Sequence, residues 1–157
     1  MKNKKILTLF FTLLVLAGAF HVWKLSNSNR TTRNDGVQVI KEVQIKNKII
    51  KVEVADDNKE KEKGLSGRKS LKESSGMLFM FDVSGDYIFW MKDMKIPIDI
   101  IWINEYLYIV HIEEGVIPET YPITFKSPSM SKYVLEVSTG FSSKNNFKVG
   151  DRVEFRP

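Results

Sequence analysis

Apolar and polar side chains alternate along several short stretches of the chain, as they do in half-buried β-strands. Between residues 48 and 55, isoleucine or valine at every second position alternates with lysine or glutamate. A side-chain period of two places these apolar residues on one face of an extended strand. The pattern therefore predicts a strand over Lys48–Ala55, with residues 37–45 as its partner strand.

The rest of the chain continues this β pattern and leaves little room for helices. Apart from Asp99, residues 98–103 are apolar on both faces, which is typical of a central strand. Residues 113–131 hold three prolines and are predicted to be an irregular crossing segment, because proline is excluded from the middle of a sheet. About eight short strands without crossover helices predict an all-β fold, a mainly antiparallel sandwich or barrel. The further predicted strands cover residues 77–81, 87–92, 106–112, 133–138 and 152–155.

One short helix is predicted after the first pair of strands. Asp57 is placed to cap the N-terminus of this helix, and Glu60 occupies the third helical position of a capping box. Gly64 is a typical residue to end such a helix. We therefore predict a helix over Asn58–Lys63, followed by a glycine-rich loop.

The N-terminal segment has the composition of an export signal. Residues 1–5 carry three lysines, and the 18 residues from 6 to 23 contain no formally charged side chain. A helix of this length spans about 27 Å, close to the hydrocarbon thickness of a bilayer. The basic N-terminus is expected to remain in the cytoplasm, so the rest of the chain is expected outside it.

Two interpretations of residues 1–23 remain open. The length of the apolar run favours an uncleaved signal anchor, with Trp23 at the membrane interface. The alternative is a signal peptide cleaved near Ala19, where small residues have the spacing of a cleavage site. Residues 24–36 are polar and predict a flexible linker to a single β domain over residues 37–157. We expect a single-pass protein of the cell membrane with this domain outside the cytoplasm, or a secreted or periplasmic domain after cleavage.

Composition and charge exclude several kinds of chemistry. The chain has no cysteine and two histidines, which excludes disulfides, zinc–thiolate sites, cysteine nucleophiles and multi-histidine metal sites. The formal net charge is +5, but residues 37–157 contain 18 basic and 18 acidic side chains, so the surplus lies in residues 1–36. A neutral domain lacks the electrostatic surface that a nucleic-acid backbone requires. We therefore predict no nucleic-acid partner, no metal and no cofactor, and a membrane partner through residues 6–23.

Asp99 is the most informative candidate, because it is a carboxylate in a strand predicted to be buried. A buried carboxylate must be paired or protonated. Arg68, in the glycine-rich loop, and Lys92 are its candidate cationic partners. In the structural interpretation, such an ion pair would hold the glycine-rich loop against the sheet. In the functional interpretation, Asp99 would act as an acid, a base or a ligand-binding group. Both interpretations stay open.

Glu136 and a group of aromatic residues supply further candidates. Glu136 lies opposite the apolar face of its predicted strand and is either a second carboxylate beside Asp99 or a solvated or ion-paired residue. Trp90, with neighbouring aromatics, forms either a stacking platform for a planar ligand or part of the core. His111 is interpreted as a satisfied or surface residue. The candidate ligand-binding residues are Arg68, Trp90, Lys92, Asp99 and Glu136.

Several uncommon sequence blocks occur in one order and resemble a known family. They are Gly64-Leu65-Ser66-Gly67-Arg68, Gly76-Met77-Leu78-Phe79-Met80-Phe81, Phe89-Trp90-Met91-Lys92, Ile96-Pro97-Ile98-Asp99-Ile100-Ile101, Tyr133-Val134-Leu135-Glu136-Val137 and Gly150-Asp151. From Val52 to about Val153 the chain resembles the family known as Domain of Unknown Function 192. The resemblance implies a compact, mainly β domain that is often exported or membrane-tethered, and it implies no activity. Asp93 and Met94 stand where the family usually has Asn-Thr.

These observations support three functional hypotheses. The first is an exported, membrane-tethered β domain that binds an envelope component or a protein partner. The alternative is an envelope-acting hydrolase that uses Asp99 with Glu136 or Arg68. The third is a purely structural module. Two carboxylates about 5–10 Å apart in one cleft would favour hydrolysis, so the relative position of Asp99 and Glu136 discriminates between binding and catalysis.

Overall fold

The structure, a computed structural model, describes residues 39–157. The predicted signal anchor or signal peptide, the predicted linker and the first two residues of the predicted β domain lie outside the described residues. Within residues 39–157, no helix is long and apolar enough to cross a membrane. The elements of this part are, in chain order, β1 (Glu42–Ile45), β2 (Lys48–Ala55), α2 (Asn58–Lys63), β3 (Ser75–Gly85), β4 (Ile88–Trp90), β5 (Ile98–Ile103), β6 (Ile109–Val116), the 3-10 helix η1 (Pro118–Thr120), β7 (Thr124–Lys126), β8 (Ser131–Ser138), α3 (Phe141–Lys144) and β9 (Val153–Arg156).

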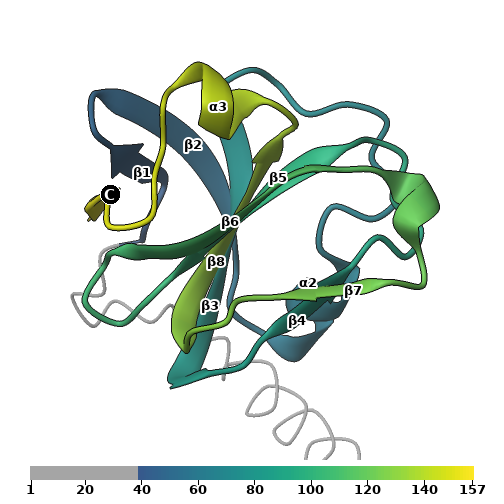
Figure 1. The fold of residues 1–157 in the computed structure, drawn as a ribbon, viewed down its shortest axis with the longest axis horizontal. Helices are drawn as coiled ribbons and strands as arrows, with labels where there is room; N and C mark the ends of the chain where they lie inside the picture. The colour runs from purple at the N-terminus through teal and green to yellow at the C-terminus, as the bar shows by residue number, and fades with distance from the viewer. Residues whose placement is uncertain (1–38) are drawn as a thin grey trace, which may run out of the picture. The chain divides into compact units, whose positions relative to one another are not determined.

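Seven of the strands form one curled sheet in the order β6-β5-β8-β3-β2-β1-β9 (Figure 1). All neighbours in this sheet are antiparallel except β2 and β3, which are parallel. The edge strands β6 and β9 approach each other at one end, where Tyr108 and Arg152 form a β-bridge and the Ile109 amide donates to the Asp151 carbonyl at 3.0 Å. This curled sheet confirms that residues 39–157 are mainly β, as the sequence predicts.

A separate two-stranded antiparallel ribbon, formed by β4 and β7, lies beside α2 (Figure 1). The ribbon and the loop after α2 contribute apolar side chains to the core on one face of the sheet. Among them, Leu65, Met91 and Phe125 pack in the same cluster as Ile100 and Trp102 of β5. The sheet therefore has one core inside its curl and a second core beneath the ribbon.

Strand β5 lies between these two cores. All six of its residues are buried, which confirms the prediction of a central strand over Ile98–Ile103. Ile101 and Ile103 belong to the core inside the curl, together with Leu135 and Val137 of β8. Successive side chains point to opposite faces of a strand, so the intervening residues of β5 pack in the second core.

The short helix α2 follows the prediction closely. The Asp57 carboxylate accepts a hydrogen bond from the Glu60 amide at 2.7 Å, as an N-cap residue does. The Glu60 carboxylate in turn accepts from the Asp56 amide at 3.3 Å. Gly64 ends the helix with φ 48°, and its amide donates to the Glu60 carbonyl at 2.8 Å. Both helix ends thus have the caps that the sequence indicates.

Several predicted boundaries are wrong. The first strand begins at Glu42 rather than at residue 37, and the strand predicted over residues 77–81 extends over Ser75–Gly85. Residues 87–92 contribute only β4, and this strand pairs with β7 rather than with the large sheet. The predicted strand over residues 106–112 begins later, at Ile109, because the Asn104 side chain accepts the amides of Tyr106 and Tyr108 and extends the turn. The segment 113–131, predicted to be irregular, contains the end of β6, η1 and β7. Helix α3, which has four residues, was not predicted.

Candidate ligand-binding pocket

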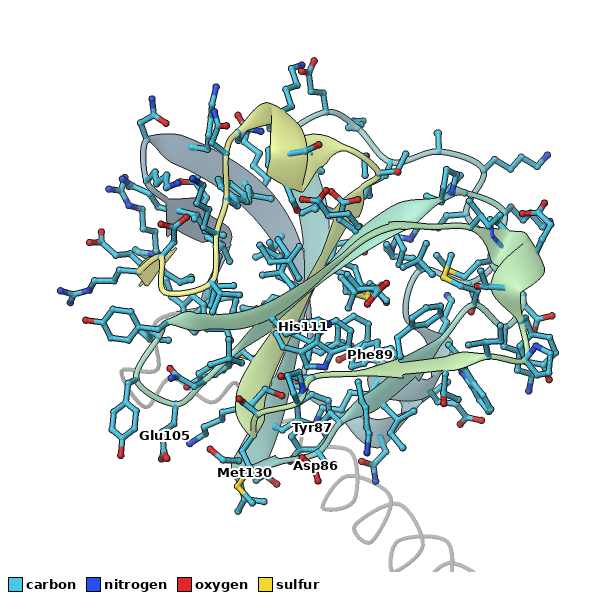
Figure 2. The ribbon with its side chains drawn as sticks, in the orientation of Figure 1. Asp86, Tyr87, Phe89, Glu105, His111 and Met130 are labelled. Carbon is cyan, nitrogen blue, oxygen red and sulfur yellow. The ribbon has the colours of Figure 1, made fainter. Side chains whose placement is uncertain are left out.

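A pocket of about 160 Å³ opens between α2, β3 and β4, and we call it the aromatic pocket. A cavity of about 150 Å³ is large enough to hold one benzene molecule, so this pocket has room for a group of about six heavy atoms. In Figure 2, Phe89 lies between the seven-stranded sheet and the β4–β7 ribbon. The residues that line the pocket are Lys61, Glu62, Lys63, Gly64, Leu65, Ser66, Phe79, Phe81, Tyr87, Ile88, Phe89, Trp90, Met94 and Glu136.

The aromatic residues of the pocket are held by one another. The period of two along β3 places Phe79 and Phe81 on the same face. Tyr87 stacks on Phe81 with ring centroids 3.4 Å apart, and its hydroxyl donates to the Val83 carbonyl at 2.6 Å. Phe89 meets the Phe79 ring edge to face, with centroids 4.9 Å apart. These contacts fix the rings before any ligand arrives.

A single carboxyl group from the large sheet reaches this aromatic surface. Glu136 of β8 is 5% exposed, and its Oε2 atom has no hydrogen-bond partner within the described residues. Its neighbours across the sheet are Met77 and Ile100, which are apolar. Burial raises the pKa of the Glu136 carboxyl to about 8, although the positive charge of Arg68 opposes this rise. A buried acceptor without a partner is costly, and Glu136 is the residue of β8 that lines the aromatic pocket.

Gly64 keeps the approach to this carboxyl open. A β-carbon built on Gly64 would lie 3.2 Å from the Phe79 ring and 3.9 Å from Oε2 of Glu136. The positive φ of 48° also favours glycine at this position. The residue that ends α2 therefore also preserves the space beside Glu136.

Lysine residues of α2 lie at the rim of the pocket. The Lys61 ammonium lies 5.1 Å from the centroid of the Phe81 ring, and it also donates to the Asp56 carbonyl at 2.6 Å. Trp90 has a similar partner, because the Lys92 ammonium lies 5.7 Å from its ring centroid. Two aromatic rings of the pocket thus already lie next to ammonium groups of the protein itself.

Asp99 does not pair with a cation, and the predicted partnership with Arg68 or Lys92 is wrong. The Asp99 side chain is fully buried, as expected, but its carboxylate accepts three backbone amides. These donors belong to Gly115 at 3.0 Å, Gly140 at 3.0 Å and Ser142 at 2.9 Å. The last two begin helix α3, whose first amides have no partner within the helix. Asp99 therefore joins α3 and the Gly115 bulge of β6 to the central strand.

Arg68 pairs with Glu53 of β2 instead. Two hydrogen bonds, of 2.5 and 2.6 Å, join its guanidinium to both carboxylate oxygens. The side chains of Arg68 and Glu53 are 33% and 61% exposed, so this is a surface ion pair. Arg68 lines a neighbouring groove rather than the aromatic pocket. Lys92 is exposed and approaches the pocket only through its contact with Trp90.

The two candidate carboxylates lie on opposite faces of the sheet. Asp99 is opposite Val137 of β8, and Glu136 is opposite Ile100 of β5. Val137 packs inside the curl, whereas Ile100 packs beneath the ribbon. A sheet therefore separates Asp99 from Glu136, and they do not face one cleft. Of the five candidates, the structure brings Glu136 and Trp90 into one pocket, with Lys92 beside it.

Several pocket residues were not among the sequence candidates. Phe79 and Phe81 were assigned to a buried strand, and Lys61 and Gly64 to a short capped helix. The available signal was the period of two that these phenylalanines share with each other, followed by the same spacing in Tyr87 and Phe89. His111 was interpreted as structural, and it packs against Trp102 with ring centroids 5.3 Å apart.

Residues 39–155 match the model of the family DUF192, described as Uncharacterized ACR, COG1430. The match covers well over half of the chain, so the protein belongs to this family. The resemblance seen in the sequence is therefore confirmed. No curated protein matches the chain at a significant level.

Two solved structures share the fold. One is a crystal structure of a "putative transcription regulator" from Sinorhizobium meliloti 1021, with 28% identity and a TM-score of 0.71 over 75% of this chain and 95% of that chain. The other is a protein of unknown function from Novosphingobium aromaticivorans DSM 12444, with 25% identity and a TM-score of 0.70 over 78% of this chain and 89% of that chain. Both cover the β domain and support its architecture.

Proposed function

We propose that this protein is a membrane-tethered binding module that takes a small ligand, or one side chain of an envelope partner, in the aromatic pocket. The observation that carries the proposal is the buried carboxyl of Glu136, a residue that lines that pocket and whose Oε2 atom has no hydrogen-bond partner within the described residues. Specific sites combine an apolar, aromatic lining with a few polar groups that orient the ligand. The aromatic pocket has this composition.

Binding is favoured over hydrolysis by the arrangement of the carboxylates. The hydrolase hypothesis requires Asp99 together with Glu136 or Arg68. The amide contacts of Asp99 assign it to the fold, and Arg68 belongs to an exposed ion pair with Glu53. The Sinorhizobium structure is described as a "putative transcription regulator". The equal numbers of basic and acidic residues over 37–157 do not favour a nucleic-acid partner for this chain.

The location outside the cytoplasm rests on residues 1–23 of the sequence. Protease added to spheroplasts should digest the β domain of the full-length protein, because the three N-terminal lysines are expected to hold the other end inside. Membrane fractionation should recover the full-length chain with the membranes if the segment is an anchor. If the domain stays intact while a periplasmic control protein is cut, the domain lies in the cytoplasm and the proposed topology is wrong.

A pair of glycine variants tests the pocket itself. Gly64→Ala adds a methyl group beside Glu136, whereas Gly67→Ala adds one at a similarly positive φ with no atom within 4 Å. Both variants carry backbone strain, but only Gly64→Ala narrows the aromatic pocket. In a thermal-shift screen of small amines, alcohols and sugars, ligands of the pocket should stabilise wild type and Gly67→Ala but not Gly64→Ala. Equal stabilisation of all three proteins would place the ligand elsewhere.

A further inference from the structure

We propose that the aromatic pocket binds an alkylammonium group, with Glu136 as its counter-ion and the surrounding rings as its walls. This inference rests on the proposed binding function and names the chemistry of the ligand. The ammonium would belong either to a free amine or to the end of a lysine side chain on an envelope partner.

The geometry favours a cation over an anion or a neutral ligand. Oε2 of Glu136 accepts no hydrogen bond from the described residues, so the carboxylate lacks a donor once it ionises. An ammonium group supplies up to three donors and a full positive charge, whereas an anion would be repelled once the carboxyl ionises. The pocket is otherwise lined mainly by apolar and aromatic side chains, which suit the alkyl chain.

The rings of the pocket suit the same ligand. The faces of aromatic rings attract cations within about 6 Å of the ring centroid. The protein already uses this interaction at the rim, with Lys61 over Phe81 at 5.1 Å and Lys92 over Trp90 at 5.7 Å. Tyr87 also stacks on Phe81, so the ligand's ammonium would lie against Phe79 and Phe89 rather than against these occupied rings. The pocket volume of about 160 Å³ fits a butylammonium-sized group.

Other charges near Glu136 do not replace such a ligand. The nearby cation from the loop, Arg68, donates to both oxygens of Glu53 and is largely neutralised there. The strand neighbours Met77 and Ile100 carry no charge. The titratable side chains that α2 and the start of the ribbon add to the pocket lining are Lys61, Glu62, Lys63 and Tyr87.

The assignment predicts a pH dependence of binding. An ammonium ligand prefers the ionised carboxylate. With a pKa of about 8, about 1% of the Glu136 carboxyl groups are ionised at pH 6 and about half at pH 8. The affinity for an alkylammonium should therefore rise about fiftyfold between pH 6 and pH 8, with release of a proton. A neutral ligand that accepts a hydrogen bond from the protonated carboxyl should show the opposite trend.

The test is isothermal titration calorimetry on the full-length protein in detergent, at pH 6 and pH 8, with matched probes. The probes are n-butylamine, butan-1-ol as its neutral counterpart, and Nα-acetyl-lysine methylamide. We expect n-butylamine to bind more tightly at pH 8 than at pH 6. The affinity for butan-1-ol should not rise between these pH values. Tighter binding of the blocked lysine than of n-butylamine would identify a lysine side chain as the source, and the reverse would identify a free amine.

Two variants complete the test. Glu136→Gln keeps the size of the side chain. It should lower the affinity for n-butylamine at pH 8 by at least tenfold and remove the pH dependence of binding. Glu114→Gln, an exposed carboxyl of β6 that does not line the aromatic pocket, should change the affinity less than threefold. If butan-1-ol binds as tightly as n-butylamine and Glu136→Gln leaves both unchanged, the ammonium assignment is wrong while the binding pocket stands. If no probe binds to folded protein, both proposals fail.

Discussion

Replacing Glu136 by glutamine should make the protein more stable at pH 8 and leave its stability nearly unchanged at pH 5. The wild-type carboxyl is buried beside apolar neighbours, and its pKa rises from 4.5 in the unfolded chain to about 8 in the folded protein. Between these two values the folded state holds a proton that the unfolded state has lost. The free energy of unfolding therefore falls as pH rises through this window.

The size of the effect follows from the two pKa values. A pKa difference between 4.5 and about 8 corresponds to about 5 kcal/mol once the carboxyl is ionised in both states. Most of this loss, about 3–4 kcal/mol, falls between pH 5 and pH 8. That is a large share of the ~5–15 kcal/mol that stabilises a typical domain. Glutamine carries no titrating group, so the free energy of unfolding of the variant does not fall in this way as the pH rises.

Urea unfolding at pH 5 and pH 8, followed by tryptophan fluorescence, to which the buried Trp102 contributes, measures this difference. Glu136→Gln should exceed wild type by about 3–4 kcal/mol at pH 8 and by less than about 1 kcal/mol at pH 5. Glu114→Gln, at an exposed position of β6, serves as the control and should follow wild type at both pH values. If the difference between Glu136→Gln and wild type is the same at both pH values, Glu136 is not a buried titrating carboxyl.

Three further predictions concern the fold. Asp99→Ala should lower the free energy of unfolding, measured with urea, by about 3–5 kcal/mol, because three buried amides lose their acceptor, whereas Arg68→Ala should lower it by less than about 1 kcal/mol. A double-mutant cycle should give a coupling energy near zero, and strong coupling would indicate that Asp99 and Arg68 form the predicted ion pair. Gly76→Ala should lower the melting temperature far more than Gly67→Ala, because its β-carbon would lie 2.5 Å from a carbonyl oxygen of β8; equal melting temperatures would contradict this close approach. Residues 37–157 expressed alone should be soluble with a cooperative thermal transition, and aggregation would show that the N-terminal segment is needed.

The fold class was predictable because alternation is recorded directly in the sequence. The two apolar faces of Ile98–Ile103 indicated a central strand, and the capped helix over Asn58–Lys63 followed from Asp57 and Gly64. The β4–β7 ribbon was missed because β7 is three residues long and stands among prolines. A strand this short does not establish an alternating pattern.

The candidate site was harder to predict, because its partners come from backbone atoms and from register. The sequence indicated that Asp99 is buried and needs partners, but only side-chain cations could be considered. Its actual partners are amides, which every residue carries, so no residue type marks them. The sequence also assigned Glu136 to one face of its strand, but the pairing of β5 with β8 was needed to show that Asp99 lies on the other face.

The pairing of β1 with β9 determines when folding can finish. Val43 of β1 lies opposite Phe155 of β9, so strands from the two ends of the described region are neighbours. Contacts so distant in sequence form only after both segments are free to meet. If the domain is exported as we propose, residues 42–45 lie closer to the membrane-proximal end and cross before residues 153–156, so β1 lacks its second neighbour until the C-terminal residues have crossed. The sheet would then be completed only outside the cytoplasm, after the last residues of the domain have crossed.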